Sequence, residues 1–233
     1  MKEGKWIELP NMNTPRGDYS GAVVSELHGL PRIFVFGGSN CGDILDTCEF
    51  LDVGEDKPQA EWTMVEAKMT TAPRHYATAT LLNQTIVIIC GGYYIASCEL
   101  FDLITLTFSS FPDLIKTRYG HASIHYNDTV VVLGGVGKKT CELFDLVTNK
   151  WIAFPSLNEV HQCFGAAVIE EKIFVAGGEI SDSVEVYDGC IWTVVTKLPA
   201  PRANFTAIDL DGTLVVLGGT QEEIDVFDPA TGG

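Results

Sequence analysis

The stretch Thr129-Val130-Val131-Val132-Leu133-Gly134-Gly135 is an aliphatic run that ends in two glycines, and the same phrase recurs along the 233-residue chain. The other copies end in Gly37-Gly38, Gly91-Gly92, Gly177-Gly178 and Gly218-Gly219. Their first glycines are separated by steps of 54, 43, 43 and 41 residues. Self-similarity at such a period predicts stacked copies of one small unit, because no single copy can bury its apolar face alone.

Each copy is predicted to contain four short strands. A basic residue, then small residues, a turn signal and the aliphatic run indicate a hairpin of two strands. After the glycines, an alternating phrase such as Cys141-Glu142-Leu143-Phe144-Asp145 indicates a third strand with one buried face. A large aromatic residue opens the fourth strand. The basic residues are Arg16, Arg74, Arg118, His161 and Arg202, and the aromatic residues are Trp62, Phe108, Trp151 and Trp192.

The fifth copy has a third strand around Phe227 but no aromatic residue after it. Trp6 precedes Arg16 by 10 residues, which is the spacing found between fourth and first strands inside the chain. We therefore expect residues 5–9 to supply the fourth strand of the last unit. Such a pairing would close a ring and hide strand edges that otherwise invite aggregation.

Taken together, these residues resemble the kelch repeat, with its arginine, double glycine, Glu-x-Phe/Tyr-Asp phrase and tryptophan. The resemblance implies an all-β fold, a five-bladed β-propeller with four antiparallel strands per blade, as a single domain over residues 1–233. The expected blades are about 16–66, 74–112, 118–155, 161–196, and 202–228 together with 5–9.

Composition bounds the partners and the compartment. The net charge of −16 argues against binding to nucleic acid or to an anionic membrane surface, since both require lysine and arginine clusters. The seven cysteines include no C-x-x-C pair, so neither a zinc site nor any other metal or cofactor is expected. The first residues lack the apolar core of a secretory signal, and reduced thiols fit a cytoplasmic protein.

Because strands alternate direction, the loops between strands two and three emerge on the same face as the links between blades. The basic residues and the aromatic residues near them belong to this face, which we call the mouth face. Such groups around a concavity are typical of interaction hot spots. The candidate contacts for a partner are Arg16, Tyr19, Arg74, Tyr93, Tyr94, Arg118, His121, His161, Phe164, Arg202 and Phe205.

A structural interpretation of the basic residues competes with this one, and it is favoured for the average arginine. Each basic residue recurs in step with an acidic residue of the third strand, so the two could form buried pairs. Structural roles are also expected for Gly37, Gly38, Gly91, Gly92, Gly134, Gly135, Gly177, Gly178, Gly218, Gly219, Trp6, Trp62, Trp151 and Trp192.

No catalytic signature supports an enzyme. The chain has no nucleophile elbow, no H-E-x-x-H, no phosphate-binding glycine loop and no dinucleotide fingerprint. The resemblance instead implies a protein-binding module, monomeric in isolation, in a ubiquitin-ligase substrate receptor or a cytoskeletal complex. Kelch-like propellers also include an oxidase and a sugar epimerase, so a small-molecule enzyme is one alternative. A purely structural part of a longer protein is the other.

Overall fold

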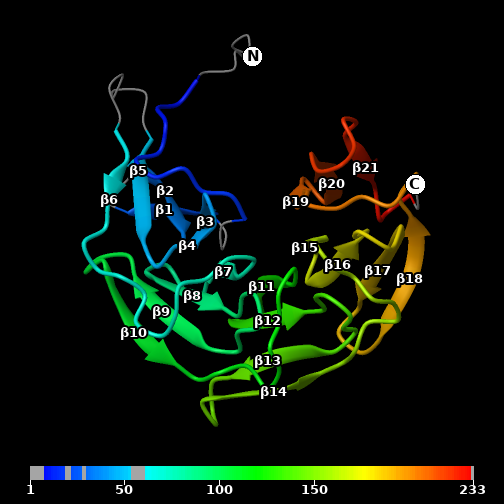
Figure 1. Cartoon of the computed structure of the whole chain (residues 1–233). Helices are drawn as coiled ribbons and strands as arrows, with labels where there is room; N and C mark the ends of the chain where they lie inside the picture. The colour runs from blue at the N-terminus through cyan, green and yellow to red at the C-terminus, as the bar shows by residue number, and fades with distance from the viewer. Residues whose placement is uncertain (1–7, 19–21, 28–29, 54–60, 232–233) are drawn as a thin grey trace.

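The computed structural model describes residues 8–18, 22–27, 30–53 and 61–231. Their strands form four four-stranded sheets, one three-stranded sheet and a small hairpin, all antiparallel. Figure 1 shows the five sheets following one another along an arc in chain order. The all-β, five-bladed propeller expected from the repeat is confirmed. No helix in the described part is long and apolar enough to cross a membrane.

The strands of the first two blades follow the predicted hairpin and third-strand pattern. Blade 1 consists of β1 (Ala22–Leu27), β2 (Leu30–Phe36), β5 (Cys48–Asp52) and β6 (Thr63–Met64). Its loop between the second and third strands carries the hairpin of β3 (Ser39–Asn40) and β4 (Asp43–Ile44). Blade 2 consists of β7 (Thr78–Leu81), β8 (Ile86–Cys90), β9 (Cys98–Asp102) and β10 (Thr107–Phe111).

The other three blades repeat this order. Blade 3 consists of β11 (Ala122–Tyr126), β12 (Thr129–Leu133), β13 (Cys141–Asp145) and β14 (Lys150–Phe154). Blade 4 consists of β15 (Gly165–Ile169), β16 (Lys172–Ala176), β17 (Ser183–Tyr187) and β18 (Trp192–Lys197). Blade 5 consists of β19 (Thr206–Leu210), β20 (Thr213–Leu217) and β21 (Asp225–Phe227). The first strands of successive blades contact one another, from β1 through β7, β11 and β15 to β19.

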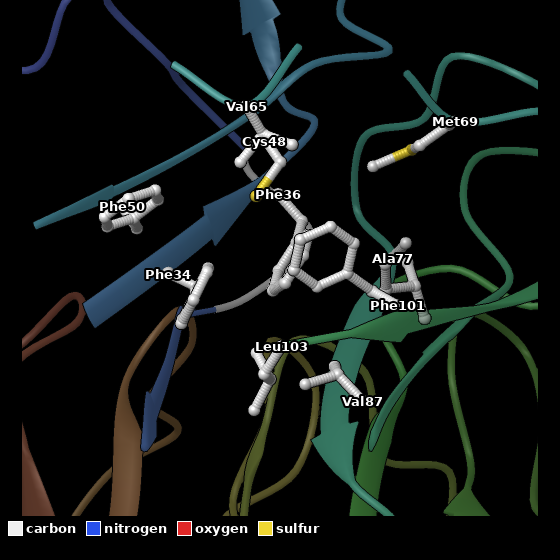
Figure 2. Close-up of a cluster of buried hydrophobic side chains, with 11 residues drawn as sticks. Phe34, Phe36, Cys48, Phe50, Val65, Met69, Ala77, Val87, Phe101 and Leu103 are labelled. Atoms are coloured by element: carbon white, nitrogen blue, oxygen red, sulfur yellow. The ribbon is translucent and has the colours of Figure 1, made fainter. Parts of the chain in front are cut away.

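The core lies between neighbouring blades. Figure 2 shows one such layer, in which Phe34 and Phe36 of β2 lie against Phe101 and Val87 of the next blade. The ring centroids of Phe36 and Phe101 are 5.2 Å apart in an edge-on arrangement. Alternate residues of a strand face opposite sides, so each sheet contributes apolar side chains to two such layers.

The glycine pairs lie where neighbouring blades meet, and glycine suits the crowded backbone there. Gly91 has a φ of 64°, and a Cβ there would lie 2.7 Å from the carbonyl oxygen of Arg118 in the next blade. The following glycine then donates its N–H to that same carbonyl at 2.9 Å. This bond joins the second glycine of a pair to the basic residue that precedes the next blade, in Gly38–Arg74, Gly92–Arg118, Gly135–His161 and Gly178–Arg202.

The tryptophans link the fourth strands. Trp151 and Trp192 are buried, and their indole N–H groups donate to the carbonyls of Pro112 and Pro155 in the preceding blades. Trp62 is half-buried and donates in the same way to Pro10. The segment around Pro10 thus occupies the place that the end of a preceding fourth strand takes at the other blades.

The last blade has three strands among the described residues, and no strand pairing joins it to blade 1 there. Figure 1 shows these two blades on either side of the open part of the arc. The predicted fourth strand at residues 5–9, with Trp6, falls largely on residues 1–7, outside the described residues, and residues 8–10 form no strand. Closure of the ring by this segment stays a prediction.

Candidate binding face

The five basic residues of the repeat are buried. The exposed fractions of Arg16, Arg74, Arg118, His161 and Arg202 are 7%, 0%, 1%, 0% and 1%. Each lies next to the acidic residue of its own third strand, at nitrogen–oxygen distances of 2.8 to 3.1 Å. The pairs are Arg16–Glu49, Arg74–Glu99, Arg118–Glu142, His161–Glu185 and Arg202–Asp225.

Arg118 shows what these pairs hold together. Its guanidinium donates to Glu142 Oε1 through Nε at 3.0 Å and through Nη2 at 2.9 Å. Its Nη1 donates to the carbonyls of Gly134 at 2.7 Å and Thr140 at 2.5 Å. Glu142 in turn accepts the backbone N–H groups of Ile115 and Lys116, in the link from blade 2. One ion pair therefore fixes the glycine turn, the following loop and the entering chain.

The surroundings of Glu99 and Glu185 favour the charged form of their carboxylates. Burial opposes ionisation of Glu99, but hydrogen bonds from the Thr71 hydroxyl and from the N–H groups of Thr70 and Thr71, with the charge of Arg74, outweigh it and lower its pKa. Burial likewise opposes ionisation of Glu185, and hydrogen bonds from His161 and two backbone N–H groups lower its pKa. The pairs of Glu99 and Glu185 are thus built around ionised carboxylates.

The histidine of blade 4 replaces the arginine with fewer bonds. His161 Nδ1 lies 2.5 Å from the carbonyl oxygen of Gly177, and Nε2 lies 3.1 Å from Glu185 Oε1. A carbonyl and an ionised carboxylate only accept, so both bonds form when both ring nitrogens carry hydrogen. His161 thereby reproduces the arginine's contacts to the glycine turn and the third strand.

Burial favours the pairing interpretation over partner contact for most of the predicted contact residues. The five basic side chains point into ion pairs, as the competing interpretation proposed. His121 is also buried, and burial together with the charge of Arg118 lowers its pKa to about 3. Phe164 is buried and Phe205 is half-buried against the blade cores. Tyr19 lies outside the described residues.

Tyr93 and Tyr94 are the predicted contacts that the structure leaves exposed, by 43% and 69%. They lie in a group that we call the tyrosine cluster, which consists of His75, Tyr76, Tyr93, Tyr94 and Tyr119. The ring centroids are 4.4 Å apart for Tyr93 and Tyr94, 4.9 Å for Tyr93 and Tyr119, and 5.8 Å for Tyr94 and Tyr119. The ring of His75 lies 5.3 Å from Tyr93 and 5.0 Å from Tyr76.

Sequence reasoning missed three members of this cluster. His75 and Tyr76 directly follow Arg74, and Tyr119 directly follows Arg118. Their positions beside the repeat arginines could have signalled that they line the mouth face. Tyr76 and Tyr94 have φ angles of 53° and 58°, a region that bulky residues rarely adopt. The surrounding hydrogen bonds, such as Tyr93 N–H to the carbonyl of His75 at 3.1 Å, hold this conformation.

A chain of backbone hydrogen bonds runs around the mouth beside the cluster. It links the residues two positions after each basic residue, which we call the mouth ring: Asp18, Tyr76, Gly120, Cys163 and Asn204. From Tyr76 onward, the backbone N–H of each member donates to the carbonyl of the member in the preceding blade. The four distances, in chain order, are 2.9, 3.4, 2.8 and 2.8 Å. Asp18 is exposed, and burial together with Asp18 raises the pKa of Tyr76. The tyrosine cluster therefore borders the exposed carboxylate of Asp18, and we call this edge of the mouth face the acidic mouth.

A hollow lies on the face opposite the mouth. It has a volume of about 420 Å³ between blades 3 and 4, and Tyr126, Asp145 and Tyr187 are among its lining residues. Asp145 accepts the N–H of Val147 and the hydroxyl of Thr148, so it is engaged in its own turn. Within the described residues, no group of three or more His, Cys, Asp or Glu could hold a metal ion.

Comparison with known proteins agrees with this architecture. Residues 117–158, which include all of blade 3 and its Arg118, match the family described as Kelch motif. This chain carries a kelch motif in a β-propeller. The recognition of kelch repeats from the sequence is confirmed in this form, and the kelch arginine, glycine pair and glutamate recur in blades 1 and 2 with the same contacts.

Solved structures share the fold. One of them, described as "Structure of YjhT", aligns with a TM-score of 0.73 over 91% of this chain and 75% of that chain, at 16% sequence identity. At this identity the likeness shows the fold alone. The search against curated proteins gave no match.

Proposed function

We propose that this kelch propeller is a protein-interaction module and that a partner segment binds at the tyrosine cluster on the mouth face. One observation carries the proposal. Aromatic rings that elsewhere in the chain are packed between blades are here gathered on the surface, with Tyr94 more than two-thirds exposed. Tyrosine is enriched among the residues that dominate binding energy at interfaces, because it offers a large rigid contact area with a polar tip.

The role is non-catalytic. Kelch propellers generally mediate protein interactions, and the described residues of the mouth face offer exposed rings and backbone groups to a partner. We further propose a cytoplasmic adaptor that is monomeric in isolation, in the manner of a substrate receptor of a ubiquitin ligase or a cytoskeletal binder. The free, mostly buried cysteines suit a reducing compartment.

The test is selection of peptides from a displayed random library on the immobilised protein, followed by affinity measurement by fluorescence polarisation. Tyr94→Ala and Tyr119→Ala should each weaken the selected peptides by about tenfold or more. The matched control is Val147→Ala, because Val147 is 93% exposed on the opposite face; it should bind like the parent. Thermal melting should be nearly unchanged for all three variants.

Two results would overturn the proposal. One is a library that yields no binder to the folded protein. The other is a set of binders whose affinity is the same for the parent and for a protein carrying both Tyr93→Ala and Tyr94→Ala.

A further inference from the structure

We propose that the tyrosine cluster and the neighbouring acidic mouth recognise an arginine side chain of the partner, whose guanidinium stacks on a tyrosine ring and pairs with a mouth carboxylate. The inference rests on the proposed function and names the chemistry of its partner. Its first ground is charge, since the chain has 31 acidic and 15 basic residues. A surface of this sign attracts cationic segments and repels acidic ones.

The second ground is the position of the carboxylates. Asp18 is exposed and is joined to Tyr76 by the backbone hydrogen bond of the mouth ring. On the side of Cys163, Glu179 is exposed, and its N–H donates to the carbonyl of Gln162 at 3.0 Å. The pKa of the Cys163 thiol is raised first by burial, then by the charge of Glu179 and then by that of Asp18. Both carboxylates therefore lie near this thiol. Asp18 is therefore the mouth carboxylate beside the cluster, whereas the Glu179 carboxylate, on the far side of Cys163, accepts a hydrogen bond from Gln162 Nε2 at 2.7 Å.

The third ground is that the rings have room for a cation. The cation–π contacts found among the described residues are those of Arg32 with Phe34 and Phe50. The contacts of Tyr93, Tyr94 and Tyr119 in the same part of the chain are with one another and with His75. Among the described residues, no lysine or arginine is found in a cation–π contact with the exposed ring of Tyr94.

Arg32 shows the arrangement that we infer for the partner. Its guanidinium carbon lies 4.2 Å from the ring centroid of Phe50, while its Nε lies 2.6 Å from Asp52 Oδ1. An aromatic ring and a carboxylate together thus hold a guanidinium on this protein. Arginine suits such a site better than lysine, because its planar group stacks on rings and forms a fork with carboxylates.

The experiment uses the full chain and a 12-residue peptide of alternating arginine and glycine, with matched peptides in which every arginine is replaced by citrulline, lysine or glutamate. Citrulline keeps the shape of arginine and removes its charge. We expect the arginine peptide to bind at least tenfold more tightly than the citrulline and glutamate peptides, and more tightly than the lysine peptide.

Variants of the protein then localise the binding. Tyr94→Ala should weaken the arginine peptide about fivefold, and Tyr94→Phe should not, since the ring face is kept. Asp18→Asn should also weaken it. The control is Glu171→Gln. It removes one exposed negative charge from the turn between β15 and β16 of blade 4, on the face opposite the mouth. It should have no effect on peptide binding beyond a small change in the salt dependence of the affinity.

Equal binding of the arginine and citrulline peptides would overturn the inference, as would equal losses for Tyr94→Ala and Glu171→Gln, which would indicate diffuse charge attraction. If library peptides without arginine bind at the cluster and are lost in Tyr94→Ala, the inference fails and the proposed function stands. If no peptide of any kind depends on the cluster, both fail.

Discussion

Replacing Arg118 by methionine should destabilise the fold severely, although the residue belongs to a face first considered for partner binding. The variant keeps the volume of the side-chain stem and removes five hydrogen bonds, to Glu142, Gly134 and Thr140. It also leaves the Glu142 carboxylate, whose side chain is 2% exposed, without its cation. Breaking a buried pair from one side costs about 3–5 kcal/mol.

Urea unfolding at pH 7, followed by tryptophan fluorescence, measures this cost. With a slope of about 2–3 kcal/mol per molar, the midpoint should fall by about 1–2.5 M. Adding Glu142→Gln to the same protein should recover part of the loss, because the stranded charge is then gone, and the two changes should be strongly non-additive. A loss below about 1 kcal/mol for Arg118→Met would refute the reasoning and restore this arginine as a surface contact.

The remaining predictions concern the turns, the carboxylates and the thiols. Gly91→Ala should cost about 2–3 kcal/mol by urea unfolding, whereas Gly137→Ala, at a similar φ of 66° with nothing within 4 Å, should cost about 1 kcal/mol; equal costs would contradict the steric argument. The pKa of Glu99 is lowered in the folded protein, so its ionised carboxylate stabilises the fold. This stabilisation should be fully present above pH 4.5, the ordinary pKa, and be lost as the pH falls through the pKa of the folded protein. A midpoint of urea unfolding that stays constant below pH 4.5 would contradict this. In the native state a thiol reagent should label the exposed cysteines first. The buried cysteines should react only on unfolding, and burial raises the pKa of one of them, Cys141, to about 11. Fast native labelling of the buried cysteines would show that the blades are open there. The exposed cysteines are Cys41 and Cys190, and the buried ones are Cys48, Cys90, Cys98 and Cys141.

The repeat made the blades predictable because the glycines of its pairs share a backbone of positive φ, which favours glycine. Gly134, for example, turns the chain at a φ of 56° and has the carbonyl of His161 2.9 Å from where a Cβ would stand. The approach to the carbonyl of the next blade's basic residue recurs at Gly91 and Gly177. The strand pattern around them follows from alternation, so the fold class and the blade order could be derived from the sequence.

The direction of the arginine side chains could not be derived in the same way. The sequence shows that Arg118 and Glu142 recur in step, but a ring of exposed arginines would produce the same pattern. Only the packed blade shows that both groups share a buried site with the backbone N–H groups of the entering chain. The pairing interpretation fits the geometry, and contact of these buried residues with a partner stays a prediction.

Two of the five residues of the tyrosine cluster were predicted from the sequence. Tyr93 and Tyr94 stood out as paired aromatic residues directly after a glycine turn. Tyr119 is 25 residues further along the chain, in the link to the next blade, and nothing local indicates that its ring lies 4.9 Å from that of Tyr93. Contacts between blades depend on the ring geometry, which the sequence pattern alone does not specify.

Modification of the folded protein by phenylglyoxal, read out by mass spectrometry of its peptides, tests most directly the claim that the repeat arginines hold the blades together from inside. Arg32 is the one arginine outside the repeat position, and its side chain is 25% exposed. The account predicts native labelling at Arg32 and protection of Arg16, Arg74, Arg118 and Arg202 until urea unfolds the chain. Labelling of Arg74 or Arg118 in the native protein at the rate of Arg32 would contradict it.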